Sequence, residues 1–326
     1  MTEKVAHFIF DVESIADGEL IADVRYGGQG LSPKEAIATY QDELVEQNGT
    51  TFIPHTYQIP ISVVIAKVAR DFSLIDIVSL DEPLFRPHVI TEHFWRGWEI
   101  YGKPQWVTFN GRSFDLPIME LAAFRYGVSA AQWFKNDGYR SPRNRFTTEA
   151  HLDLQELLTN YGAARCNGGL NLIAQLVKKP GKMDLRGDQV QQQYDDGKLT
   201  EISDYCRCDV LDTYFIFLRS MVLMGKTTID NEMQLVQQAK QWIEQRADTS
   251  DAYTAYLNAW RDWEKPRDEK DDQAEASAPE SDAPSASNEN STANKGSDAS
   301  EAFDAGEAAA ASKTSDASNA SGSNKS

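Results

Sequence analysis

Cysteine is scarce in this sequence, and long hydrophobic runs are missing. The three cysteines among 326 residues, Cys166, Cys206 and Cys208, form no Cys-x-x-Cys pair, which excludes a disulfide scaffold and a cysteine-based zinc site. A reducing compartment fits this composition best. The N-terminal residues reach Asp11 after only a short apolar stretch, which predicts neither a signal peptide nor a membrane span. We therefore expect a cytoplasmic protein with no membrane partner.

Large apolar residues are almost absent from the last part of the sequence. From Pro266 onward Ser, Ala, Asp, Asn, Glu and Gly dominate, and Phe303 is the only large apolar residue. Such a segment cannot bury enough surface to offset the conformational entropy that folding costs. The sequence therefore predicts one globular domain over residues 1–265 and a disordered, acidic, low-complexity tail over residues 266–326.

Positive charge is also in short supply, since the net charge is −18. The tail holds 13 acidic and 5 basic residues, which leaves 37 acidic and 27 basic residues for the domain. The net charges are therefore −8 and −10. Proteins that bind nucleic acid usually carry a basic footprint, so this balance is unusual for them unless some carboxylates serve a metal site.

The hydrophobic pattern predicts strands first and then mostly helices, which favours an α/β fold with a mixed sheet flanked by helices. Ser32 before Pro33 is typical of a helix N-cap. A Thr91 cap is expected for a second helix. The expected strands cover 5–13, 61–69, 74–80 and 106–109, the second and third forming a hairpin, and the expected helices cover 32–47, 91–101, 114–126, 169–178, 187–194, 199–224, 228–246 and 252–263.

Four carboxylates follow or interrupt these elements. Asp11 and Glu13 leave the same face of the first strand, Asp115 follows the strand-to-helix turn after residue 109, and Asp209 lies four residues after Tyr205 on one helix face. A cage of hard oxygen ligands suits two divalent ions about 4 Å apart that cleave a phosphodiester bond. Four negative charges balance two Mg²⁺ ions, so the metal-free site is expected to repel nucleic acid.

Three motifs carry a resemblance to a known family. They are Phe-Asp11-Val-Glu13, Asn110-x-x-x-Phe114-Asp115 and Tyr205-Cys-Arg-Cys-Asp209. Together they resemble the DEDDy 3′ to 5′ exonucleases, and most closely the stand-alone relatives of the proofreading domain of family-B DNA polymerases. The resemblance covers roughly residues 5–224, and no segment after residue 265 could fold into a polymerase.

The resemblance implies a ribonuclease-H-like fold and release of nucleoside monophosphates from the 3′ end of single-stranded nucleic acid, with DNA favoured and RNA left open. By position, Asp11, Glu13, Asp115 and Asp209 would bind two Mg²⁺ or Mn²⁺ ions, while Tyr205 would orient the attacking water. The sister subclass has histidine five residues before the last aspartate, where this chain has Asp204. Only the tyrosine subclass therefore fits.

The sequence signals for residues that contact the substrate are less specific than the three motifs. Asn110 could hold backbone, and Phe114 could wedge against the terminal base or belong to the core. Between Arg125 and Phe146 basic residues alternate with aromatic residues that include Trp133, as single-strand binding requires. These aromatics would offer flat faces to bases, although an ordinary connection with buried aromatics remains the alternative. Arg143 and Arg145 are the candidates in that stretch. Lys182 is the candidate in a second basic cluster at residues 178–186.

Other titratable residues near the motifs also have a structural interpretation. His151 and Asp153 either support the site or form a structural turn, with the turn favoured. Asp212 follows Asp209 by one helical turn and is expected in the surroundings of the site or at the surface, since the Tyr-x-x-x-Asp spacing selects Asp209.

Two other functions remain as alternatives. A haloacid-dehalogenase-type phosphatase has an Asp-x-Asp-x-Thr loop that residues 11–15 superficially resemble, but Glu13 stands where that loop requires aspartate. A non-catalytic nucleic-acid-binding module would most often lack one of the four carboxylates, and here none is missing.

Overall fold

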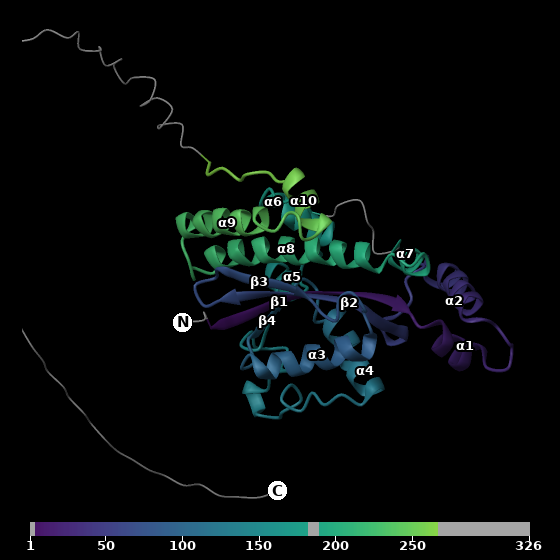
Figure 1. Cartoon of the computed structure of the whole chain (residues 1–326). Coiled ribbons are helices and arrows are strands. Elements are labelled where there is room, and N and C mark those ends of the chain that lie inside the picture. The colour runs from purple at the N-terminus through teal and green to yellow at the C-terminus, as the bar shows by residue number, and fades with distance from the viewer. Residues whose placement is uncertain (1–3, 182–188, 267–326) are drawn as a thin grey trace, which may run out of the picture. The chain divides into compact units, whose positions relative to one another are not determined.

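A five-stranded mixed sheet runs through the centre of the fold (Figure 1). The computed structural model describes residues 4–181 and 189–266. β1, β2 and β3 pair antiparallel, whereas β4 runs parallel to β1 and β5 parallel to β4, which confirms the expected mixed α/β sheet. In the spatial order β3-β2-β1-β4-β5, the strands are β1 (Val5–Ala16), β2 (Gln58–Ala69), β3 (Leu74–Ser79), β4 (Gln105–Thr108) and β5 (His151–Asp153).

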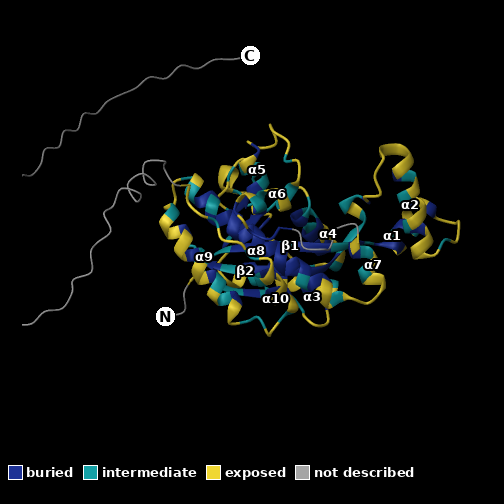
Figure 2. Cartoon of the chain, turned by 90° about the horizontal axis from the view of Figure 1, so that it is seen from above, coloured by how far each residue is buried: buried dark blue, intermediate teal, exposed yellow. Residues whose placement is uncertain are grey.

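Helices cover both faces of this sheet (Figure 1). α3 (Pro87–Ile100) and α4 (Asp115–Tyr126) lie on one face, and α8 (Leu199–Leu223) lies on the other beneath α9 (Ile229–Glu244) and α10 (Asp251–Asn258). Figure 2 shows that α8 and β1 are buried at the centre. The shorter elements are α1 (Gly18–Tyr26), α2 (Pro33–Asn48), α5 (Leu154–Leu158), α6 (Gly169–Leu176), α7 (Val190–Asp195), and the 3₁₀ turns η1 (His55–Tyr57) and η2 (Gly138–Arg140).

Side-chain alternation along β1 supplies both halves of the core. Phe8 and Phe10 pack with the tryptophans of α3 and β4, whereas Ile9 packs with residues of α8. Successive side chains of a strand point to opposite faces. Asp11 and Glu13 therefore leave β1 on the side of Ile9, toward α8.

Local capping explains why α2 was predicted almost to the residue. The Ser32 hydroxyl accepts a hydrogen bond from the Glu35 backbone N–H at 3.3 Å, and the Glu35 carboxylate accepts one from the Ser32 N–H at 2.9 Å. This reciprocal pair satisfies two N–H groups that a helix start leaves without partners. Gly49 ends the helix in the left-handed conformation.

The expected Thr91 cap is wrong. α3 begins four residues earlier at Pro87, and the Thr91 hydroxyl donates a hydrogen bond to the Pro87 carbonyl at 2.6 Å inside the helix. Proline fits the first helical position because it has no N–H to satisfy there. The short elements α1, β5 and α5 were not predicted, and the strand expected over 5–13 continues to Ala16.

Some predictions concern segments outside the described residues. These segments include Lys182, the first part of the helix expected over 187–194, and all of the expected tail except Pro266. The tail and the boundary after residue 265 stay predictions. Among the residues that the structure describes, no helix combines the length and apolar character needed to cross a membrane.

Candidate active site

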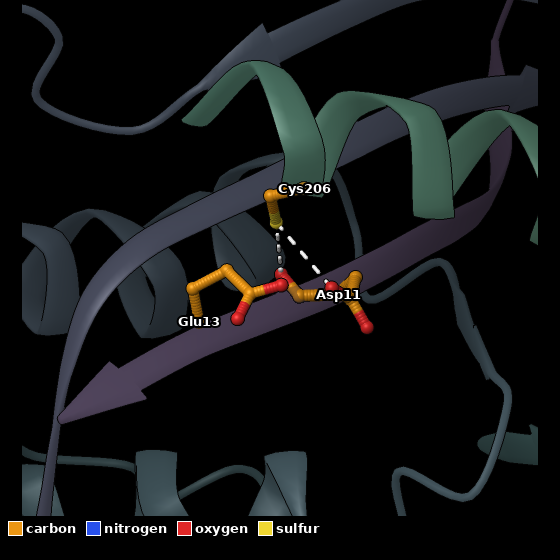
Figure 3. Close-up of side chains that lie close together, drawn as sticks. All are labelled: Asp11, Glu13 and Cys206. Carbon is orange, nitrogen blue, oxygen red and sulfur yellow. Dashed lines mark hydrogen bonds between the residues drawn. The ribbon is translucent and has the colours of Figure 1, made fainter. Parts of the chain in front are cut away.

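Asp11 and Glu13 form the first part of the site, on the α8 side of β1. One carboxylate oxygen from each, together with the Cys206 sulfur, lies within 4.8 Å of the others (Figure 3). Glu13 is buried and Asp11 is half-buried. The period of two along a strand thus brings the two acidic side chains together, as the sequence predicted.

Asp115 reaches β1 from the opposite side of the sheet. Parallel pairing between β1 and β4 ends at Ile9, so β1 continues beyond β4. There the Val12 N–H donates a hydrogen bond to Asp115 Oδ1 at 3.1 Å. Burial raises the pKa of the Asp115 carboxyl well above its usual range, and the nearby negative charge of Asp11 raises the pKa further.

The turn that delivers Asp115 has a constrained backbone. Asn110 adopts a left-handed conformation with φ of 67°. At Gly111 a Cβ atom would lie 2.5 Å from Thr108 Cβ, so any larger residue would require the turn to move. The Asn110 side chain accepts hydrogen bonds from the Ser113 hydroxyl at 2.6 Å and from Gln155 Nε2 at 3.2 Å. These side-chain contacts link the turn to α5, and the backbone-holding role expected for Asn110 stays a prediction.

Asp153 fixes the same turn from β5. Its carboxylate accepts hydrogen bonds from the backbone N–H groups of Asn110 at 3.0 Å and Arg112 at 2.9 Å, and it also caps α5. Asp153 ends β5 and caps α5, whereas a simple turn was the favoured expectation for this residue. The Asp153-Leu-Gln-Glu156 spacing, which resembles a capping box, was the signal that could have revealed it.

His151 lies just behind this turn, on β5. It is buried, and its Nε2 atom lies 2.8 Å from the Thr108 hydroxyl. Burial lowers the pKa of its imidazole well below the usual value, and the positive charge of Arg112 acts in the same direction. A neutral histidine supports the β4–β5 pair and is not directed at the carboxylates of β1.

Tyr205 and Asp209 come from one face of α8 and are both buried. Burial raises the pKa of the Tyr205 hydroxyl, as do the negative charges of Asp209, Glu13 and Asp11, in that order. A hydrogen bond to Asp209 contributes to the same shift. The tyrosine therefore keeps its proton beside three acidic side chains. Tyr205 and Asp209 are four residues apart, so they share the helix face that is directed toward β1.

Cys206 lies on α8 above Asp11 (Figure 3). Burial raises the pKa of its thiol well above the usual value, and the charges of Asp11 and Glu13 raise the pKa further. The protonated sulfur is a poor ligand for a hard cation, whereas the two carboxylates suit Mg²⁺ or Mn²⁺. No pattern in the sequence indicates that Cys206 lies beside Asp11.

The four predicted ligands are not gathered into one tight cluster. In the described part of the chain, the 4.8 Å group contains Asp11 and Glu13 but neither Asp115 nor Asp209. Asp115 accepts a hydrogen bond from the backbone of β1, and Asp209 interacts with Tyr205.

Asp212 is directed away from this group. It is fully buried, and its Oδ1 accepts a hydrogen bond from the Tyr256 hydroxyl of α10 at 2.6 Å. Burial raises the pKa of Asp212 to about 7. A surface position, one of the two expected for this residue, is therefore wrong.

A cavity of about 320 Å³ adjoins Glu13. Phe114 lines it from the turn before α4, and Phe52 lines it from the segment before β2, with their ring centroids 6.0 Å apart. Phe52 is 54% exposed. Phe114 also packs partly against the core, which was one of its two expected positions, and its contact with a terminal base stays a prediction. Nothing in the sequence around Phe52 indicated that it would lie beside Phe114.

A second cavity, of about 380 Å³, contains Arg143 and Arg145. Arg143 is held by Glu120 through hydrogen bonds of 2.7 and 2.8 Å. The Arg145 guanidinium lies 5.8 Å from the Phe146 ring centroid. The expectation that Trp133 offers a flat face to bases is wrong, because this residue is 1% exposed and packs on the tryptophans of α3.

Comparison with known proteins adds a family match. Residues 50–260 match a family described as predicted 3′–5′ exonucleases related to the exonuclease domain of PolB. The matched range contains Asp115, Tyr205 and Asp209 and begins after Asp11 and Glu13, which β1 contributes by pairing with β2 and β4. No curated protein matches the chain.

Proposed function

Because the chain belongs to the family of predicted 3′–5′ exonucleases related to the exonuclease domain of PolB, we propose that it uses two divalent metal ions to remove nucleotides from single-stranded 3′ ends. The products are nucleoside monophosphates, and DNA is the favoured substrate. The observation that carries this proposal is the close approach of the Asp11 and Glu13 carboxylates, within 4.8 Å, beside a family-matched Asp115 and Asp209. The strand order β3-β2-β1-β4-β5 supports a ribonuclease-H-like fold.

The donor set fits Mg²⁺ or Mn²⁺, since all four predicted ligands are carboxylates. Asp11 and Glu13 would bind the two ions together with Asp115 and Asp209. The ions supply an activated water and stabilise the leaving oxygen. Tyr205 keeps its hydroxyl proton beside this group and would orient the water by hydrogen bonding.

The cavity at Glu13 supports a single-stranded end as substrate. Its volume of about 320 Å³ is at the lower end of small-molecule sites, which suits one nucleotide. Phe52 and Phe114 offer aromatic faces from two different segments, and stacking of one base on an aromatic ring contributes about 1–3 kcal/mol. A paired end would have to be opened before its last nucleotide could enter.

Phosphate binding is assigned to the second cavity in this proposal. Glu120 offsets most of the charge of Arg143, so Arg145 is the better candidate for a phosphate contact. Metal ions at the carboxylates would remove further repulsion between an acidic domain and an acidic substrate. We also propose a cytoplasmic location, which the three free cysteines support.

The test uses matched DNA and RNA oligonucleotides labelled at the 5′ end, in Mg²⁺ and in Mn²⁺. Stepwise shortening from the 3′ end, lost with a chelator and lost in Asp11→Asn, is the expected result. Shortening of duplex DNA with equal speed would refute the single-strand assignment. Binding without cleavage would favour the non-catalytic module, and release of phosphate from a small phosphomonoester alone would favour the phosphatase.

A further inference from the structure

Cys206 contacts Asp11 twice. The sulfur lies 3.4 Å from the Asp11 carbonyl oxygen and 3.5 Å from Asp11 Oδ2 (Figure 3). Cys206 is completely buried, and it follows Tyr205 directly on α8. The contact therefore joins the helix that carries Tyr205 and Asp209 to the strand that carries Asp11 and Glu13.

The thiol can only donate in this position. A carbonyl and a carboxylate oxygen are both acceptors, so the Cys206 S–H is the donor in both contacts. The single proton is shared between two acceptors of the same residue. Sharing ties the Asp11 carboxylate to its own backbone and limits the rotation of the side chain.

We propose that Cys206 is a positioning residue for the metal site, whose thiol holds the Asp11 carboxylate in the orientation it shares with Glu13. This inference rests on the proposed metal-binding role of Asp11. Partners in the outer shell of a metal site orient the ligands and commonly affect metal affinity. The weak sulfur donor orients the oxygen while leaving its charge available to a cation.

Cys208 provides a matched control on the same helix. It is also buried, and its sulfur lies 3.9 Å from the Ala252 carbonyl of α10, away from Asp11. Cys206→Ala and Cys208→Ala remove the same atom from the same helix, so their difference isolates the contact with Asp11. Cys206→Ser restores a donor with a shorter reach.

The experiment measures Mn²⁺ affinity by calorimetry without oligonucleotide, the melting temperature, and the Mg²⁺ dependence of the exonuclease rate, all on the full chain. We expect Cys206→Ala to weaken Mn²⁺ binding by about tenfold, the lower end for an outer-shell partner, and to raise the Mg²⁺ concentration needed for half-maximal rate. Cys206→Ser is expected between Cys206→Ala and the wild type. Cys208→Ala is expected to lower only the melting temperature.

Equal metal affinity in the wild type, Cys206→Ala and Cys206→Ser would overturn the inference, because packing alone would then account for the residue. A Cys206→Ala chain that does not fold leaves Cys206→Ser to decide the same comparison. Failure of the wild type itself to bind Mn²⁺ would instead overturn the proposed metal site, so the two failures are distinguishable.

Discussion

Tyr205 and Asp209 lie one helical turn apart on α8 but have different tasks in the proposed reaction. Asp209→Asn removes a negative oxygen, so we expect weaker metal binding as well as lost turnover. Tyr205→Phe removes only a hydroxyl, so we expect unchanged metal affinity and melting temperature. Losing one positioned hydrogen bond at a transition state costs about 2–4 kcal/mol, which corresponds to roughly 10²–10³ in rate. Calorimetry with Mn²⁺ and single-turnover rates check both variants.

A comparison of Asp209 with the neighbouring Asp212 could contradict this assignment. An inactive Asp212→Asn beside an active Asp209→Asn would show that the wrong carboxylate has been assigned. The hydrogen bond from Tyr256 to Asp212 argues against that result, because it directs Asp212 toward α10.

Asp212 gives a prediction for stability against pH. Burial raises its pKa from 3.8 to about 7, so between these values the folded chain holds a proton that the unfolded chain has released. The stabilising contribution is therefore complete below about pH 4 and is lost as pH rises through about 7, at a rate of at most about 1.4 kcal/mol per pH unit. Asp212→Asn has no proton to lose. Its melting temperature is expected to rise relative to the wild type between pH 5 and pH 8.

An exposed aspartate on α2, Asp42, supplies the comparison. Asp42→Asn should follow the wild type across the same range. If the difference between Asp212→Asn and the wild type stays constant from pH 5 to pH 8, the carboxyl is charged in the folded chain throughout.

At the scale of elements, the turn between β4 and α4 connects fold to site. The buried Asp153 carboxylate accepts from Asn110 and Arg112 in this turn. Asp153→Asn replaces an acceptor oxygen by a donor, and an unsatisfied buried N–H costs about 1–3 kcal/mol. We expect a lower melting temperature together with weaker Mn²⁺ binding, because the turn delivers Asp115.

Thr228→Ala is the control for this prediction. The Thr228 hydroxyl caps α9, far along the chain from the carboxylates, and losing such a cap costs about 1 kcal/mol. Its melting temperature should fall with no change in Mn²⁺ affinity. If Asp153→Asn and Thr228→Ala lose stability equally and both keep full Mn²⁺ affinity, Asp153 acts only as a helix cap.

Elements whose determinants lie within their own residues can be predicted from the sequence, and elements that depend on distant residues cannot. α2 and α8 could be predicted because caps and a long apolar pattern lie within their own residues. β5 has three residues and exists through its pairing with β4, which no local pattern encodes. The pairing of Asp11 with Glu13 follows from strand periodicity, whereas Phe52 beside Phe114 depends on tertiary packing. Trp133 was misplaced for the same reason.

At the scale of the whole molecule, charge sets how readily an acidic substrate approaches. The net charge is −18, of which −8 belongs to residues 266–326. Carboxylates at the site lose part of their repulsion when cations bind, but the charges elsewhere remain. Salt concentration should therefore control binding through the whole chain as well as through single contacts.

The last prediction compares the full chain with one that ends at Lys265. Because residues 1–265 are predicted to hold all of the core, the shorter chain should keep its melting temperature and its metal-dependent rate. Removing a charge of −8 should tighten oligonucleotide binding. The effect should be larger at 0.01 M salt, where charge interactions reach over about 30 Å, than at 0.15 M, where they reach over about 8 Å. Binding is best measured in Tyr205→Phe chains, in which the expected fall of roughly 10²–10³ in rate slows the loss of the oligonucleotide. A tail of equal length with its acidic residues changed to amides separates the effect of charge from the effect of bulk.

Equal oligonucleotide affinities of all three chains at low salt would show that the tail has no screening role. A lower melting temperature of the shorter chain would place the domain boundary beyond residue 265.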